Sequence, residues 1–143
     1  MSVKSILQSK GREVATIAPD ATLGQATKIL AEMRIGALVV TKPTGAIAGI
    51  LSERDIVRAV AADAAGAMKK PVSAYMTAKV KTCREDNSVN DVMEIMTAGR
   101  FRHLPVEKDG KLAGIVSIGD VVKRRIEDVE REAESIRAYI ASA

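Results

Sequence analysis

Two segments of the chain place a serine hydroxyl and a carboxylate three residues apart, directly after a short apolar run. Residues 49–55 have the sequence Gly-Ile-Leu-Ser-Glu-Arg-Asp, and residues 114–120, 65 positions later, have Gly-Ile-Val-Ser-Ile-Gly-Asp. A carboxylate there can accept hydrogen bonds from ribose hydroxyls, and the serine can donate one to a phosphate or ribose oxygen. Where a strand turns into a helix, free amides and the helix dipole also favour anions. The pattern therefore predicts a pair of ligand sites.

A structural role would explain each segment taken alone. Ser52 with Asp55, and Ser117 with Asp120, have the Ser-x-x-Asp spacing that resembles a helix capping box. The same side chains can cap a helix and hold a ligand, so both interpretations stay open.

The similarity between the two segments extends over most of the chain. The offset falls from 66 to 65 after the turn at residues 43–45, where surface turns tolerate a change of length. A single duplication of this length predicts one two-lobed module rather than a solenoid. At the offset of 66, Val14, Thr16, Asp20, Ile29, Arg34, Leu38 and Val40 match Val80, Thr82, Asp86, Ile95, Arg100, Leu104 and Val106.

Each copy has the pattern of a strand, a helix, a hairpin and a second helix. We predict strands at 14–17 and 79–83, helices that begin at Thr22 and Ser88, and hairpins formed by 35–41 with 46–51 and by 103–107 with 112–117. Helical turns at 3–7 and 72–76 lead into the two copies. The predicted fold class is therefore α+β, with two β-α-β-β-α repeats. The repeats span 1–63 and 72–126, with a linker at 64–71 and a helical extension at 127–143.

The C-terminal helix has an apolar seam with the spacing of a coiled coil. One interpretation is that this seam packs back on its own module. Because the seam runs about two heptads past Asp120, we expect it instead to meet a partner helix, which predicts a homodimer or higher homo-oligomer. The seam consists of Val122, Ile126, Val129, Ala133, Ile136 and Ile140.

Composition limits the classes of protein that fit. The 143 residues are 47% apolar, with a net charge of +4 concentrated before the last helix, which suits a small anionic ligand or simply a basic surface. No apolar run approaches the roughly 18–20 residues that cross a bilayer, and the N-terminus lacks the pattern of a secretory signal. Three aromatic residues and no nucleic-acid-reading motif argue against nucleic-acid binding. The single cysteine suits a reducing compartment, so we expect a cytoplasmic location.

The sequence offers little support for a catalytic or a metal-binding site. His103 is the only histidine, and no nucleophile can be placed beside it, so a structural or phosphate-binding role is favoured. Cys83 lies in an apolar pattern and is interpreted as a small buried hydrophobe. One histidine and one cysteine form no metal cluster. We therefore predict a protein that is not an enzyme and holds no metal.

The duplicated Gly-apolar-x-Ser-x-x-Asp segments, together with the Arg-His-Leu-Pro-Val run at 102–106, resemble the cystathionine-β-synthase-type (CBS) domain family. The resemblance covers residues 3–125, as a tandem pair known as a Bateman module. It implies a regulatory module that binds AMP, ADP, ATP or NAD in the cleft between the repeats. Such a module would pass the ligand state to an unidentified effector protein by conformational change or oligomerisation. A dimerising interaction module without a small-molecule ligand remains the alternative.

The resemblance also implies which residues form each site. One site would combine Ser52, Arg54 and Asp55 with Lys81, Thr82, Phe101, Arg102 and His103. The other would combine Ile115, Ser117 and Asp120 with Ala15, Thr16, Ile35, Gly36 and Ala37.

The two implied sites differ in charge. Arg102 and His103 would face Asp55, whereas Gly36 and Ala37 would face Asp120. Guanidinium groups pair well with phosphate oxygens, so we expect the Asp55 site to prefer a phosphorylated ligand. A weakly charged or extended ligand would suit the Asp120 site better.

Overall fold

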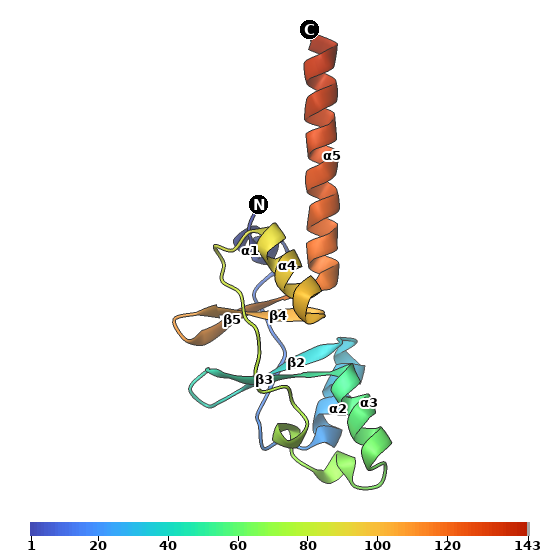
Figure 1. Cartoon of the computed structure of the whole chain (residues 1–143). Helices are drawn as coiled ribbons and strands as arrows, with labels where there is room; N and C mark the ends of the chain where they lie inside the picture. The colour runs from blue at the N-terminus through green and yellow to red at the C-terminus, as the bar shows by residue number, and fades with distance from the viewer. Residues whose placement is uncertain (143) are drawn as a thin grey trace.

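The computed structural model describes residues 1–142, which form two lobes and a projecting helix (Figure 1). In the first repeat, a small sheet and two of the three helices lie at the end of the molecule opposite the projecting helix. Its sheet has the order β1-β2-β3, with β1 parallel to β2 and β2 antiparallel to β3. The elements are α1 (Val3–Lys10), β1 (Thr16–Ile17), α2 (Leu23–Met33), β2 (Ala37–Thr41), β3 (Ile47–Ser52) and α3 (Glu53–Ala62).

The second repeat has the same order of elements but only a two-stranded antiparallel sheet. Asp109 and Gly110 have φ angles of 53° and 76°, the left-handed backbone that a two-residue hairpin turn requires, so the predicted hairpin is confirmed. The linker contains the 3-10 turn η1 (Ala67–Lys69). The second repeat consists of the 3-10 turn η2 (Val72–Ala74), the helix α4 (Val89–Gly99), the strands β4 (His103–Lys108) and β5 (Lys111–Ser117), and the start of the helix α5 (Ile118–Ser142).

The predicted strand at 79–83 was wrong, because only Cys83 pairs with β4, in a single parallel bridge to Val106. In the first repeat, the Val39 amide donates to the Ala15 carbonyl at 3.2 Å and extends the ladder. Pro105 takes the position of Val39 in the second repeat and has no N–H to donate. The ladder therefore stops before it reaches residues 79–82.

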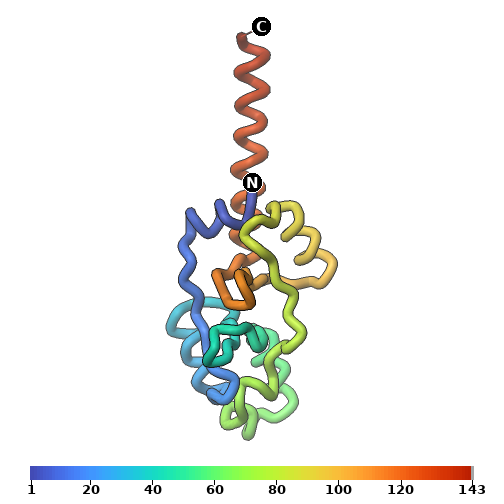
Figure 2. The backbone as a smooth tube through the Cα atoms, turned by 90° about the vertical axis from the view of Figure 1, so that its left-hand side faces the viewer, coloured from blue at the N-terminus to red at the C-terminus, as the bar shows by residue number. Residues whose placement is uncertain are grey.

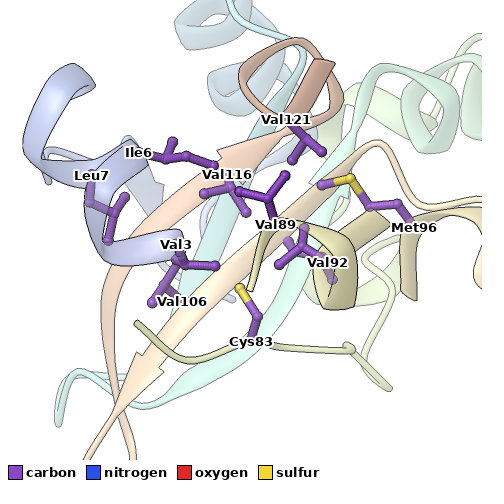
Figure 3. Close-up of a cluster of buried hydrophobic side chains, with 11 residues drawn as sticks. Val3, Ile6, Leu7, Cys83, Val89, Val92, Met96, Val106, Val116 and Val121 are labelled. Atoms are coloured by element: carbon purple, nitrogen blue, oxygen red, sulfur yellow. The ribbon is translucent and has the colours of Figure 1, made fainter. Parts of the chain in front are cut away.

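Each lead-in segment packs into the core of the other repeat. Val3, Ile6 and Leu7 of α1 are at most 5% exposed and lie among buried residues of α4, β4 and β5 (Figure 3). In the opposite direction, Ala67 and Val72 complete the core of the first repeat. The chain thus crosses between the lobes twice, along opposite sides of the module (Figure 2). This exchange buries the two lead-ins and fixes the repeats against each other.

The two hairpins lie side by side in the middle of the module, where the Leu112 amide donates to the Gly45 carbonyl at 3.2 Å. The strands β3 and β5 then lead into α3 and α5. Because these helices begin at Ser52 and Ser117 or directly after them, the two serine-aspartate segments lie where sheet becomes helix.

Helix α5 extends well beyond the module as a single rod of 25 residues (Figures 1 and 2). At 1.5 Å per residue it is about 37 Å long. The predicted seam stays open to solvent along this rod, with exposed fractions of 49% at Val122, 53% at Ile126 and 59% at Ile136. The seam therefore does not pack back on its own module. No helix of residues 1–142 combines the length and the apolar character needed to cross a membrane.

Candidate functional site

Both serine-aspartate pairs form the capping boxes that their spacing indicates. The Ser52 amide donates to Asp55 Oδ2 at 2.8 Å, and the Asp55 amide donates back to Ser52 Oγ at 3.4 Å. At the second pair the matching distances are 2.9 and 3.1 Å. Within residues 1–142, the other carboxylate oxygen of Asp55, Oδ1, has no hydrogen-bond partner. The cap therefore leaves one acceptor of Asp55 free.

Asp55 lines a cavity of about 500 Å³ between the two repeats, a volume within the range of small-ligand pockets. The first repeat contributes Gly36 and the start of α3. The second contributes the turn between α4 and β4 and the crossing segment before Cys83. Of the residues predicted for this site, Ser52, Arg54, Asp55, Lys81, Phe101, Arg102 and His103 line the cavity. Thr82 is not among the lining residues.

The cavity lining carries an excess of positive charge. It has five cationic side chains, Arg54, Arg58, Lys81, Arg100 and Arg102, against two carboxylates, Glu53 and Asp55. Within the described chain none of these cations takes part in an ion pair. Unpaired guanidinium and ammonium groups around a concave site attract anions and offer charge-assisted hydrogen bonds.

Several of these lining residues were not predicted from the sequence. Arg100 follows α4 in the left-handed conformation, with φ of 56°, and this bend begins the turn that leads into the cavity. Ile50 and Thr77 form the wall beneath it, where their backbones exchange hydrogen bonds of 3.0 and 2.9 Å. In the sequence, Arg100 stood out only because it matches Arg34 in the other repeat, and that match does not indicate a ligand site.

His103 lines the Asp55 cavity, and its pairing with Ser117 across the hairpin also brings it close to the Asp120 segment. An added Cβ on Gly36 would lie 3.4 Å from His103 Cε1, so Gly36, predicted for the Asp120 site, in fact lies beside the imidazole in the Asp55 cavity. Burial, and then repulsion from Lys10, lower the pKa of His103 below its usual value, against the attraction of Asp120 and Glu53. Burial thus favours the neutral form of the imidazole.

The Asp120 carboxylate is already engaged by a cation of the chain itself. Lys10 Nζ lies 2.7 Å from Asp120 Oδ2 and 3.0 Å from the carbonyl oxygen of Ile115. Partial burial raises the pKa of Asp120, but the hydrogen bonds from Lys10 and Ser117 outweigh it and hold this pKa below its usual value. Lys10 lies 110 positions from Asp120 in the chain and was not predicted from the sequence.

Four other residues predicted for the Asp120 site do not line the cavity that Asp120 lines. Ala15 and Ile35 pack against the core of the first repeat, and Ala37 pairs with Ser52 across the hairpin. Thr16 is exposed on β1. The cavity that Asp120 does line measures only about 50 Å³ and contains none of these four residues.

The remaining reactive groups form no second centre. Cys83 is 2% exposed, and burial raises the pKa of its thiol to about 12, so its interpretation as a buried hydrophobe is confirmed. Among residues 1–142, no three histidine, cysteine or acidic side chains gather closely enough to hold a metal ion.

Comparison with protein families shows to which family the two repeats belong. The model of the CBS domain matches the chain twice, at residues 3–62 and 72–127. The chain belongs to the CBS domain family. The two repeats are thus a pair of CBS domains, and the cavity at Asp55 lies in the cleft between them.

Solved structures share this arrangement over nearly the whole chain. The CBS-domain containing protein ATU1752 from Agrobacterium tumefaciens is 50% identical, with a TM-score of 0.84 over 87% of this chain and 99% of that one. The CBS domain pair of protein MJ0100, solved with 5-methylthioadenosine and S-adenosyl-L-methionine, is 28% identical, with a TM-score of 0.80 over 90% of this chain and 98% of that one. A curated relative is the mitochondrial CBS domain-containing protein CBSX3 of Arabidopsis thaliana. It is 34% identical over 97% of this chain and 71% of its own length.

Proposed function

We propose that this CBS pair is a regulatory module that binds an adenosine nucleotide in the Asp55 cleft. The observation that carries the proposal is the lining of that cleft. It combines a carboxylate with one free oxygen and five cations that have no ion-pair partner within residues 1–142. A nucleotide presents the complementary groups, ribose hydroxyls that donate hydrogen bonds and a phosphate that accepts them. The adenosyl ligands of the MJ0100 pair support the choice of base.

The groups of the cleft suggest how the ligand would lie. Asp55 Oδ1 would accept from a ribose hydroxyl at the start of α3, close to the positive end of the helix dipole. Arg102, Arg100 and Lys81 would contact the phosphate from the second repeat. Phe101 is half-buried in the same turn and offers an apolar face to the base. AMP, ADP, ATP and NAD all carry these groups, and AMP is the smallest probe among them.

Ligand binding would regulate because the cleft is built from both repeats. A nucleotide that contacts α3 of one repeat and the 99–103 turn of the other favours the arrangement in which the two lie closest. A ligand shifts such an equilibrium only by its difference in affinity for the two arrangements. No residue of the cleft offers an activated nucleophile, so we propose binding rather than catalysis.

We also propose that the module acts as a homo-oligomer in the cytoplasm. The open seam of α5 is self-complementary, since two copies of the same apolar stripe can cover each other. A change in the module could thereby reach a partner copy or an effector protein. A dimerising module without a ligand is the second candidate, and the same exposed seam favours it.

The test compares two capping aspartates that differ only in their surroundings. Asp55 and Asp91 each close a capping box at a helix start, but Asp91 lies on α4 and does not line the cleft. In calorimetric titrations with AMP, Asp55→Asn should lose binding while Asp91→Asn binds like the wild type. Equal affinity in all three proteins, or no binding of AMP to the wild type, would reject the Asp55 cleft as the site.

A further inference from the structure

The last residue of α1 reaches across to the second repeat. Lys10 ends the helix, and its ammonium lies between the Asp120 carboxylate and the Ile115 carbonyl, at 2.7 and 3.0 Å. The helix behind it is anchored, because Val3 and Leu7 are fully buried in the second core. Lys10 is therefore held in place by the packing of its helix and by two acceptors at once.

The equivalent groups of the Asp55 site have no such occupant. Ile50 corresponds to Ile115, and its carbonyl accepts from the backbone amide of Thr77 at 2.9 Å. Within residues 1–142 no lysine or arginine pairs with Asp55. The difference follows from the lead-in segments. The lead-in of the first repeat, α1, is a helix of eight residues, whereas that of the second repeat, η2, is a turn of three residues, after which the chain pairs with β3 at Thr77.

The cavities beside the two carboxylates also differ, and the one at Asp55 is the larger. Asp55 lines a cavity of about 500 Å³, whereas Asp120 lines one of about 50 Å³ in which Lys10 itself forms part of the wall. Ligand pockets commonly enclose at least 300 Å³. The cavity at Asp120 is lined by residues of α1 and α5 alone, so Lys10 and its helix close off the Asp120 carboxylate on that side.

We propose that Lys10 occupies the Asp120 site with its own ammonium group, which neutralises the carboxylate that the ribose hydroxyls of a second nucleotide would contact. Each chain then binds one nucleotide, at Asp55, and the N-terminal helix sets this stoichiometry. The inference rests on the proposed function, because it assumes that the Asp55 cleft takes an adenosine nucleotide.

The test counts AMP molecules per chain by calorimetry and native mass spectrometry. Lys10→Met removes the ammonium but keeps the aliphatic stem, and it should raise the count from one to two. Adding Asp120→Asn to Lys10→Met should return the count to one. Lys4→Met is the matched control, since Lys4 is an exposed lysine of the same helix, and it should leave the count at one.

The outcomes separate this inference from the proposed function. One AMP in both the wild type and Lys10→Met, or two in the wild type, would overturn the role of Lys10 and leave the Asp55 cleft standing. No AMP in either protein would overturn both. No AMP in the wild type but one in Lys10→Met would uphold Lys10 and reject the Asp55 cleft. Carbon-13 NMR of the Asp120 carboxyl gives a readout without ligand: its pKa should rise in Lys10→Met, and an unchanged pKa would show that the ion pair does not form.

Discussion

The charge of the Asp55 cleft predicts a specific preference for phosphorylated over neutral adenosine. Five cations and two carboxylates leave about three net positive charges on the lining. One charge pair at about 6 Å in water contributes roughly 0.7 kcal/mol, and pairs at exposed positions are no stronger. AMP should therefore bind about 30-fold more tightly than adenosine at low salt, which is about 2 kcal/mol.

A single arginine should account for a predictable share of that preference. Arg102→Gln should weaken AMP binding about threefold to fivefold and leave adenosine binding unchanged. Arg34→Gln is the control, because Arg34 is an exposed arginine at the corresponding turn after α2 and does not line the cleft. In about 1 M salt, where the Debye length falls to about 3 Å, the preference for AMP should shrink to a few-fold.

Calorimetric titrations of AMP and adenosine into the three proteins, at two salt concentrations, measure all of these ratios. Equal binding of AMP and adenosine by the wild type at low salt would refute the electrostatic reasoning. So would an Arg102→Gln variant that loses affinity for adenosine as much as for AMP, because that loss would come from changed structure rather than from charge.

Three further predictions concern the scaffold. Ile136→Glu places a charge on the open seam and should lower the oligomeric state in light scattering, as should truncation at Glu127. Ala138→Glu, on the opposite side of α5, should leave the oligomeric state unchanged. An unchanged mass for Ile136→Glu would show that the seam is not the interface. Leu7→Ala should reduce the free energy of unfolding by about 2–5 kcal/mol in denaturant titrations because Leu7 is fully buried in the second core, and a loss under about 1 kcal/mol would contradict that packing. The pKa of Asp120 is lower in the folded chain, so its stabilising effect is full above the unfolded value of about 3.9 and is lost as pH falls through the folded pKa. Lys10→Met should therefore flatten the acid side of the stability curve, and an equally steep loss would argue against the ion pair.

Local chemistry made much of this fold predictable. The capping boxes at Ser52, Ser88 and Ser117 and the Asp-Gly turn each depend on residues a few positions apart, and all of them form as expected. The internal duplication indicated two similar lobes, and the resemblance to CBS domains implied the cleft between them. Most of the residues predicted around Asp55 do line the cleft, because they lie in short segments at the ends of the predicted strands and helices.

Features that depend on docking could not be predicted in the same way. The exchange of the lead-in segments follows from how α1 packs on the second core, and no pattern within residues 1–10 specifies that partner. The contact of Lys10 with Asp120 depends in turn on the length and direction of α1. The missing strand before Cys83 depends on Pro105, whose effect becomes visible only once the pairing of the strands is known.

The most direct test of the nucleotide site is a proton–nitrogen NMR titration of the wild-type chain with AMP. We predict saturable shifts of the amides at 50–55, 77–81 and 99–103, which surround the cleft, with no saturable shift at Asp120. The absence of any saturable shift, or a first response around Asp120, would contradict it.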